Sequence, residues 1–590
     1  MLTPSLHRLS GLCLAIALLC NVACNKDDTI DAPLPPTIAL DSETGIYTVK
    51  AGAELTVAPT VEHADGAEIL WRLDGRIVCR TLVYTAVWEE VGDFYPVLTV
   101  RTEAGTAEEQ IRVEVVERTP PVISLPVPPE GLQAVAGMEL RLEPTYRYDE
   151  EPFRVEWLRD DAVVGTERSY AFRAERAGRY RLLVRATNAD GTTCRELTIE
   201  VFDELPRAAT FPARSHRDPS TDRHTLVGRT LLLRPELRHF AHPRFAWSID
   251  GRPTACTDPL LRFTPAAGGT YRIAVTVTEA ETAASRTAEV VVHCSDKSER
   301  ELLRPRTAGS SLRQQRVWEW TPAPGQFIGE TGPQGGMTGN ETTPEAADAW
   351  ALRRLTAKLP VSLGGFGGYI VVGFDHSIPR GSTGYDFAIA GNAYTSKGGS
   401  SNEPGIVWVM QDTNGNGEPD DEWYELRGSE TGKAETLQEY AVTYYRPAGP
   451  RMAVEWSDSE GQRGSIDYLP AFHDQESYYP AWIGAEAYTL RGTRLSAQNR
   501  LDPATDFWSN LAYAWGYADN TGSDRIAEGD EEGNGQETGF RIANAVYPDG
   551  TPVELQFIDF VKVQTGVNAR SGHLGEISTE VCSFRDCAEQ

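Results

Sequence analysis

Stretches of alternating apolar and polar residues run through the first half of the chain, and each follows a tryptophan. Residues 182–187 show one such stretch. Alternation with a period of two is typical of a strand that buries one face. Trp71, Trp157 and Trp247 lie in similar local sequences, and each precedes a Gly-x-aromatic triplet by a nearly equal interval. The pattern predicts three copies of one seven-strand sandwich of about 90 residues, with each tryptophan in the core rather than in a binding site.

Proline-rich breaks separate the copies and set the expected boundaries. The copies resemble immunoglobulin-like domains of the PKD type. Three in series would form a stalk, followed by a linker rich in Ser, Arg and Gln. The expected sandwiches cover 36–117, 118–204 and 205–294, the linker covers 295–314, and a C-terminal domain covers 315–590.

The C-terminal domain is richer in glycine and aromatic residues. One helix is expected near Thr342, which has capping-box spacing to Glu345, with Pro344 at the first turn and good helix formers to Leu355. Strands are expected at 369–375, 385–389, 405–410, 440–445, 488–490 and 557–563. The pattern predicts a larger β-sandwich of the jelly-roll kind, so that the whole chain is all-β apart from one short helix.

The chain begins with a short segment that has the three parts of an export signal. Residues 1–23 contain one cation, an apolar run too short to span a bilayer, and a small residue before Cys24. This is the pattern of a bacterial lipoprotein signal peptide, with 24–35 as the anchor linker. Lysine and two aspartates at 26–28 resemble the export tag of Bacteroidota surface lipoproteins. The resemblance implies a protein on the outer face of the outer membrane that is attached to the membrane only by its lipid anchor. The alternatives are a leader cut elsewhere and a merely solvated linker.

Net charge limits the classes of binding partner, and cysteine content limits the role of disulfides in the fold. The formal net charge of −29 over 590 residues argues against nucleic acid, which needs a basic surface. An acidic chain suits solubility outside the cell and hard cations such as calcium. Six cysteines follow Cys24, too few to build the fold from disulfides. Candidate pairs are Cys256 with Cys294 and Cys582 with Cys587.

An acidic loop at 412–422 has the spacing of a calcium site. Oxygen donors stand at positions one, three, five and nine, and glycine stands at position six, where the chain must turn sharply. Trp423 occupies position twelve, so Glu422 or a distant acid must complete the site. No second helix follows, which favours a structural ion over a regulatory EF-hand; the alternative is a solvated turn. The expected ligands are Asp412, Asn414, Asn416, Glu418 through its carbonyl, Asp420 and Glu422.

Several motifs of the last domain carry a family resemblance. They lie at 363–376, 385–387, 391–393, 403–407, 478–482, 516–520 and 558–566. The domain resembles the C-terminal domain of PKD-containing Bacteroidota surface lipoproteins, some of which, the BtuH-type proteins, bind vitamin B12. The resemblance implies capture of vitamin B12 or a related corrinoid for a TonB-dependent outer-membrane transporter.

Aromatic residues are dense between 478 and 517, and a corrinoid or a sugar chain needs aromatic surface with polar groups at its edge. The expected ligand-binding residues are Tyr478, Tyr479, Trp482, Trp508 and Trp515. Glycan binding or adhesion is the rival interpretation.

Catalysis finds little support in the sequence. It contains neither a Gly-x-Ser-x-Gly elbow nor a His-Glu-x-x-His zinc motif. A hydrolase that uses two carboxylates remains the third hypothesis. His376 at a strand end is expected to be a hydrogen-bonded structural residue rather than a cobalt ligand. We therefore expect a binding protein, not an enzyme.

Overall fold

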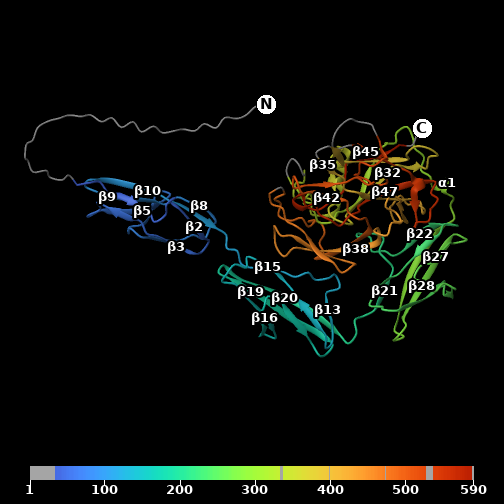
Figure 1. Ribbon diagram of the computed structural model, residues 1–590, viewed down its shortest axis with the longest axis horizontal. Coiled ribbons are helices and arrows are strands. Elements are labelled where there is room, and N and C mark those ends of the chain that lie inside the picture. The colour runs from blue at the N-terminus through green and yellow to red at the C-terminus, as the bar shows by residue number, and fades with distance from the viewer. Residues whose placement is uncertain (1–32, 332–335, 397–398, 472, 527–535, 588–590) are drawn as a thin grey trace, which may run out of the picture. The chain divides into compact units, whose positions relative to one another are not determined.

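The protein is described by a computed structural model that covers residues 33–331, 336–396, 399–471, 473–526 and 536–587 (Figure 1). The expected signal peptide and Cys24 lie outside these residues. The chain divides into two compact units, 1–119 and 120–590. Within the described residues, no helix is long and apolar enough to cross a membrane.

The first unit is a β-sandwich. Its main sheets have the strand orders β10-β9-β5-β6 and β2-β11-β8, with β2 parallel to β11 and two short pairs, β1-β4 and β3-β7. The strands are β1 (Thr37–Ala39), β2 (Ile46–Lys50), β3 (Glu54–Val57), β4 (Thr60–Glu62), β5 (Glu68–Leu73), β6 (Arg76–Cys79), β7 (Tyr84–Val87), β8 (Gly92–Phe94), β9 (Val97–Thr102), β10 (Gly105–Gln110) and β11 (Arg112–Val116).

The second unit begins with two sandwiches of the same topology. The strand orders β13-β20-β19-β16-β17 and β22-β29-β28-β25-β26 correspond strand for strand. The former uses β12 (Val122–Ser124), β13 (Leu132–Val135), β14 (Glu139–Leu142), β15 (Thr145–Arg147), β16 (Arg154–Arg159), β17 (Ala162–Gly165), β18 (Tyr170–Arg173), β19 (Gly178–Asn188) and β20 (Gly191–Phe202). The latter uses β21 (Ala208–Thr210), β22 (Arg223–Leu226), β23 (Leu231–Leu233), β24 (Glu236–Arg238), β25 (Pro243–Ile249), β26 (Arg252–Pro253), β27 (Leu261–Phe263), β28 (Gly269–Glu279) and β29 (Ser285–Ser295).

The repeated tryptophan has one structural role in all three sandwiches, as the sequence predicts. Trp71, Trp157 and Trp247 are buried at 0%, 0% and 2% exposure. Each indole N–H donates to a main-chain carbonyl ten or eleven residues later, at 2.9 to 3.1 Å. Burying the ring while satisfying its only polar atom makes the tryptophan a core anchor.

The C-terminal domain contains the remaining strands of the described residues, arranged in several sheets. The largest has the order β30-β32-β47-β36-β37-β46, and two four-stranded sheets follow as β44-β45-β33-β49 and β40-β39-β38-β41. Its strands are β30 (Arg316–Thr321), β31 (Val361–Ser362), β32 (Tyr369–Pro379), β33 (Phe387–Gly391), β34 (Tyr394–Ser396), β35 (Gly399–Ser401), β36 (Gly405–Met410), β37 (Trp423–Leu426), β38 (Leu437–Tyr445), β39 (Val454–Asp458), β40 (Arg463–Ile466), β41 (Ala487–Arg494), β42 (Asn499–Asp502), β43 (Phe507–Asn510), β44 (Arg525–Ile526), β45 (Gln536–Phe540), β46 (Ala545–Val546), β47 (Phe557–Thr565), β48 (Glu580–Val581) and β49 (Ser583–Asp586).

All six strands expected here are present. The expected helix is α3 (Pro344–Thr356), but its N-cap is Thr343, one residue later than the capping box predicts, with the Thr343 hydroxyl accepting from the Ala346 N–H. The 3-10 turns are η1 (Ile542–Asn544) and η2 (Gly572–Leu574).

The expected linker at 295–314 does not stand free. It contains a short helix, α1 (Glu299–Leu302), and then lies along the C-terminal domain. The Arg304 guanidinium donates to the buried Asp559 carboxylate at 2.8 Å, and Arg313 donates to the Ser583 hydroxyl at 2.9 Å. The expectation of a free linker is wrong for an electrostatic reason. The arginines that made the segment look like a polar linker instead pair with carboxylates and hydroxyls of the domain.

Neither candidate disulfide is formed. The Cys256 thiol donates to the Leu260 carbonyl, and the buried Cys294 thiol lies against the Ser295 carbonyl. The Cys587 thiol likewise donates to the Arg585 carbonyl rather than bonding to Cys582. The cysteines of both candidate pairs are therefore present as thiols rather than as disulfides.

Candidate ligand pocket and calcium loop

A pocket of about 310 Å³ opens between the β39–β40 hairpin and the loop after β47. The two segments are about a hundred residues apart in sequence, which no local pattern connects. The pocket combines an aromatic wall, exposed glycine backbone and several polar side chains. Its lining consists of Trp456, Gly464, Ser465, Ile466, Asp467, Asn568, Ala569, Arg570, Gly572, Gly575 and Glu576.

Trp456 forms the aromatic wall of this pocket. It pairs across the hairpin with Gly464, and a Cβ at Gly464 would overlap the indole ring. The glycine thus lets the ring lie flat across the neighbouring strand. Trp456 is partly exposed, whereas Trp320, Trp350 and Trp482 of the same domain are buried. A flat, partly exposed indole is a suitable surface for one face of a ring-shaped ligand.

Glu576 places a carboxyl group at the inner side of the pocket. It is 6% exposed; Oε1 accepts from the Gln326 N–H at 2.7 Å, whereas Oε2 finds no partner among the described residues. Burial raises the pKa of Glu576 to about 7, and main-chain hydrogen bonds only partly offset this. A buried acceptor without a donor costs about 1–3 kcal/mol. Such a group beside a cavity is a candidate for ligand binding.

The other charges of the pocket neutralise each other. Arg570 forms an ion pair with Asp467, which also accepts from the Ser465 hydroxyl at 2.6 Å. Asn568 adds an amide, whose nitrogen donates to the Tyr440 hydroxyl at 2.9 Å. Polar groups thus surround the indole, and Glu576 is the one carboxylate in the lining without a cationic partner among the described residues.

Three of the five aromatic residues expected to bind ligand belong to the core. Tyr478, Tyr479 and Trp482 are between 0% and 6% exposed. The Trp482 ring lies 4.8 Å from Trp320, and Tyr479 lies edge-on to Tyr488 at 5.3 Å. Their density in the sequence reflects core packing, and they offer no face to a ligand in this structure.

The other two expected residues lie apart from each other. Trp508 on β43 packs against Gly572, which lines the pocket, so Trp508 supports it from outside. Trp515 lines a separate cavity of about 250 Å³ with Arg427 and Arg541. The expectation of one aromatic surface from these five residues is therefore corrected. Trp456, the tryptophan that does line the pocket, carried no distinguishing sequence signal because its exposure depends on the opposite glycine.

The predicted calcium loop is a tight turn organised by Asp412. Its Oδ1 accepts from the Gly415 N–H at 2.6 Å, and its Oδ2 accepts from the Gly417 N–H at 2.8 Å. The Asn414 and Asn416 side-chain amides donate to Asp420 at 3.0 Å each. The hydrogen bonds close the loop around Asp412, with its oxygens facing main-chain N–H groups and the two asparagine amides facing Asp420 through their nitrogens; calcium binding here stays a prediction.

Two further acids of the loop depart from the prediction. Glu422, expected to complete the site, instead pairs with Arg223 of the third sandwich at 3.2 Å. Asp421 is 5% exposed, and its Oδ2 has no partner among the described residues. Burial, with Asp412 and Asp420 nearby, raises the pKa of Asp421 well above its ordinary value. An all-oxygen donor set with a buried, unpartnered carboxylate fits a calcium ion, with Asp421 in the place expected for Glu422.

Calcium is therefore expected to raise the stability of the protein. At a hundredfold excess over the dissociation constant, one bound ion adds about 2.7 kcal/mol to the free energy of unfolding. Asp412→Ala should abolish that gain, whereas Glu418→Gln should keep it, since Glu418 is exposed and expected to bind only through its carbonyl. Thermal unfolding with calcium and with EGTA checks this, and equal curves for the wild-type chain would contradict it.

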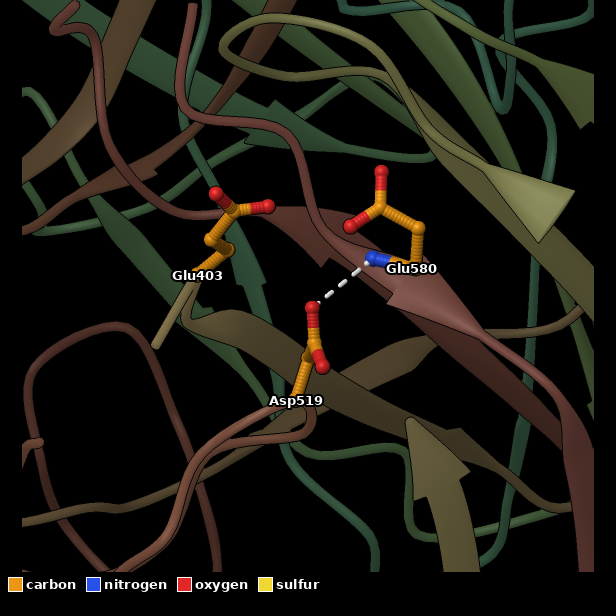
Figure 2. A group of neighbouring side chains, drawn as sticks. All are labelled: Glu403, Asp519 and Glu580. Carbon is orange, nitrogen blue, oxygen red and sulfur yellow. Dashed lines mark hydrogen bonds between the residues drawn. The ribbon is translucent and has the colours of Figure 1, made fainter. Parts of the chain in front are cut away.

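A second acidic group was not found from the sequence because its members come from distant segments. Glu403, Asp519 and Glu580 each bring a carboxylate oxygen to within 4.8 Å of the others (Figure 2). Asp519 accepts from the main-chain N–H groups of Asn392 and Ala393 at 2.9 and 2.8 Å, and from that of Glu580 at 3.0 Å. These bonds tie the loop at Asp519 to the end of β33 and to the start of β48.

Burial is the largest cause that raises the pKa of Glu403, and the charges of Glu580 and Asp519 raise it further, well above its usual value. Glu403 and Glu580 also share a hydrogen bond, which requires one proton between two carboxylates. We call this buried group of Glu403, Asp519 and Glu580, which holds a shared proton, the carboxyl clasp.

This clasp predicts a pH dependence of stability. An unfolded glutamate titrates near 4.5, so the folded state loses stability as the pH rises from there through the raised pKa of Glu403. Each unit of difference is worth about 1.4 kcal/mol. Glu403→Gln should reduce the loss, while exposed Glu460→Gln should not. Urea unfolding at acidic and alkaline pH measures it; an unchanged pH dependence in Glu403→Gln would exclude the clasp.

His376 has the structural role expected of it. It is fully buried, Nδ1 lies 2.7 Å from the Asp375 carboxylate, and Nε2 lies 3.0 Å from that of Asp586. With both ring nitrogens engaged, it offers no lone pair to a ligand.

Comparison with known proteins concerns the sandwiches. A family model described as a PKD-like domain matches residues 35–102 and 120–188. No curated protein is similar in sequence at a significant level. The solved structures that match include the titin I-band fragment I67–I69, with 16% identity, 45% of this chain and 99% of that chain covered, and a TM-score of 0.20. Three N-terminal domains of the outer capsid protein Hoc of bacteriophage RB49 match with 12% identity over 45% of this chain and 100% of that chain, at a TM-score of 0.21.

These scores are too low to carry an argument about function. The third sandwich, found here through Trp247, repeats the strand order of the second but is not matched by the family model. The protein is thus an all-β chain that contains two PKD-like domains.

Proposed function

We propose that the chain is a cell-surface binding protein whose C-terminal domain, a jelly-roll-like sandwich stabilised by calcium, holds a sugar ring in the pocket beside Trp456. The observation that carries this proposal is the juxtaposition of a flat, partly exposed indole with buried Glu576, whose Oε2 has no partner among the described residues. Indole faces accept the apolar face of a sugar, and polar groups at the edge accept its hydroxyls.

The size of the pocket favours a sugar over a corrinoid. At about 310 Å³ it lies at the small end of the range for small-molecule sites, roughly 300–1,000 Å³. A sugar ring fits such a volume, whereas a corrinoid would enter only with an edge. The leader and Cys24 expected from the sequence support display outside the cell. Delivery to an outer-membrane transporter belongs to the corrinoid alternative.

The proposal is tested by binding measurements on the full chain. A glycan array followed by calorimetry should find saturable binding that Trp456→Ala weakens roughly thirtyfold or more. Cyanocobalamin is titrated in parallel, with and without calcium. Sugar binding with unchanged affinity in Trp456→Ala would move the site elsewhere. Tight binding of cyanocobalamin with no sugar binding would replace the sugar by a corrinoid.

A further inference from the structure

The cavity beside Trp515, which we call the Trp515 pocket, is separate from the pocket beside Trp456 and shares no lining residue with it. It lies where the end of β37, the loop at 515–524 and the end of β45 meet. Its volume of about 250 Å³ is just below the usual range for small-molecule sites, which begins at roughly 300 Å³. The Trp515 pocket therefore suits one small ring rather than a large ligand.

Two aromatic rings belong to the wall of the Trp515 pocket. Trp515 and Tyr385 are both partly exposed. The Tyr385 ring lies against Gly539 of β45, where a Cβ would overlap the ring. The glycine thus permits the close approach of ring and strand. Partly exposed rings of this kind can contact the apolar face of a sugar.

Arg427 and Arg541 are the only cations among the described residues of the lining. The Arg541 guanidinium lies 5.7 Å from the centroid of the Tyr385 ring, which places it at the wall. The Arg427 N–H donates to the Asn544 carbonyl at 3.0 Å, which holds the end of β37 beside the turn after β45.

Neither of these two guanidinium groups forms an ion pair or a hydrogen bond with another described residue. Arg570 in the pocket beside Trp456, by contrast, is held by Asp467. A guanidinium presents its N–H donors in a fork that matches a carboxylate. The Trp515 pocket therefore offers unused donors for an anionic group.

Asp524 adds a buried carboxyl group to the Trp515 pocket. It is 7% exposed, and its Oδ2 accepts from the Gly516 N–H at 2.6 Å, whereas its Oδ1 has no partner among the described residues. Burial is the largest cause that raises the pKa of Asp524. Even with Asp524 ionised, two arginines leave the lining with a net positive charge. The Oδ1 atom is available to a hydroxyl group of a ligand.

We propose that the Trp515 pocket binds a uronic acid, a sugar ring that carries a carboxylate. The carboxylate pairs with the two arginines, the apolar face of the ring contacts the aromatic wall, and a hydroxyl meets Asp524 Oδ1. This second site does not depend on the pocket beside Trp456. A phosphate fits less well, because its greater negative charge would lie close to the Asp524 carboxyl group.

Calorimetry of the full chain at neutral pH with methyl glucuronide, methyl glucoside and glucose 6-phosphate tests the inference. Methyl glucuronide should bind roughly tenfold or more tightly than the other two ligands. Arg427→Gln and Arg541→Gln should each remove most of this preference. Both arginines are exposed, so these variants should fold. Arg500→Gln is the matched control, because Arg500 is also exposed but does not line the pocket.

The outcomes separate this inference from the proposed function. The preference for methyl glucuronide should persist in Trp456→Ala, and its loss there would overturn the second site by assigning the acid to the other pocket. Equal affinities for methyl glucuronide and methyl glucoside would overturn the inference and leave the pocket beside Trp456 standing. A preference that persists in both Arg427→Gln and Arg541→Gln, or tighter binding of glucose 6-phosphate, would also overturn it.

Discussion

Trp482→Ala is expected to lower the free energy of unfolding of the C-terminal domain by about 3–5 kcal/mol. Trp482 is 6% exposed, and its ring lies 4.8 Å from Trp320, which is itself stacked on Trp350 at 4.9 Å. Removing the indole opens a cavity inside this cluster, and the neighbouring rings are too rigid to fill it. Urea unfolding of the full chain, followed through the transition of its C-terminal domain, measures the loss.

Trp482→Phe is the matched control. It keeps an aromatic ring in the cluster and should cost much less than the alanine variant. Neither variant, while folded, should change the affinity for the ligand. If Trp482→Ala folds with normal stability but no longer binds the ligand, the result would instead support a ligand-binding aromatic surface formed by residues 478–517.

Trp456→Ala should affect binding more than folding, in contrast to Trp482→Ala. We expect a large loss of affinity for the sugar and a smaller loss of stability. Truncating an aromatic residue at the centre of a binding site lowers the binding free energy by about 2 kcal/mol or more, which corresponds to a roughly thirtyfold larger dissociation constant. Trp456 is partly exposed, so its removal opens the pocket wider rather than leaving a closed cavity. Calorimetry with the bound sugar and urea unfolding on the same preparation measure both effects.

Trp318→Ala serves as the control for Trp456→Ala. Trp318 lies on β30, is also partly exposed, and does not line the pocket. Its removal should leave the affinity unchanged. Equal loss of binding in both variants would mean that the effect comes from a general disturbance of the domain.

The sequence was most informative where one residue type recurred with local regularity. Trp71, Trp157 and Trp247 stand at equivalent places, and alternation around them fixes which face is buried. The strands of the C-terminal domain were found by the same reasoning, because each is a run of apolar residues between turns. The calcium-like loop was found because its donors lie within one turn of chain.

The pocket could not be predicted because it depends on contacts between distant segments. Glu576 becomes a buried, unpartnered carboxyl only through packing against Gln326, some 250 residues earlier. The aromatic density of the sequence points to Trp482, and only the packing shows that Trp456 lines the pocket and Trp482 lies in the core. Glu422 and Asp421 are neighbours, and Arg223 of another domain decides which of them stays unpaired.

A crystal structure of the full chain grown with a bound sugar tests the central claim most directly. The account predicts the sugar ring face-on against Trp456, with one of its hydroxyls within hydrogen-bond distance of Glu576 Oε2. A sugar bound at another place on the domain, with the pocket beside Trp456 unoccupied, would contradict it.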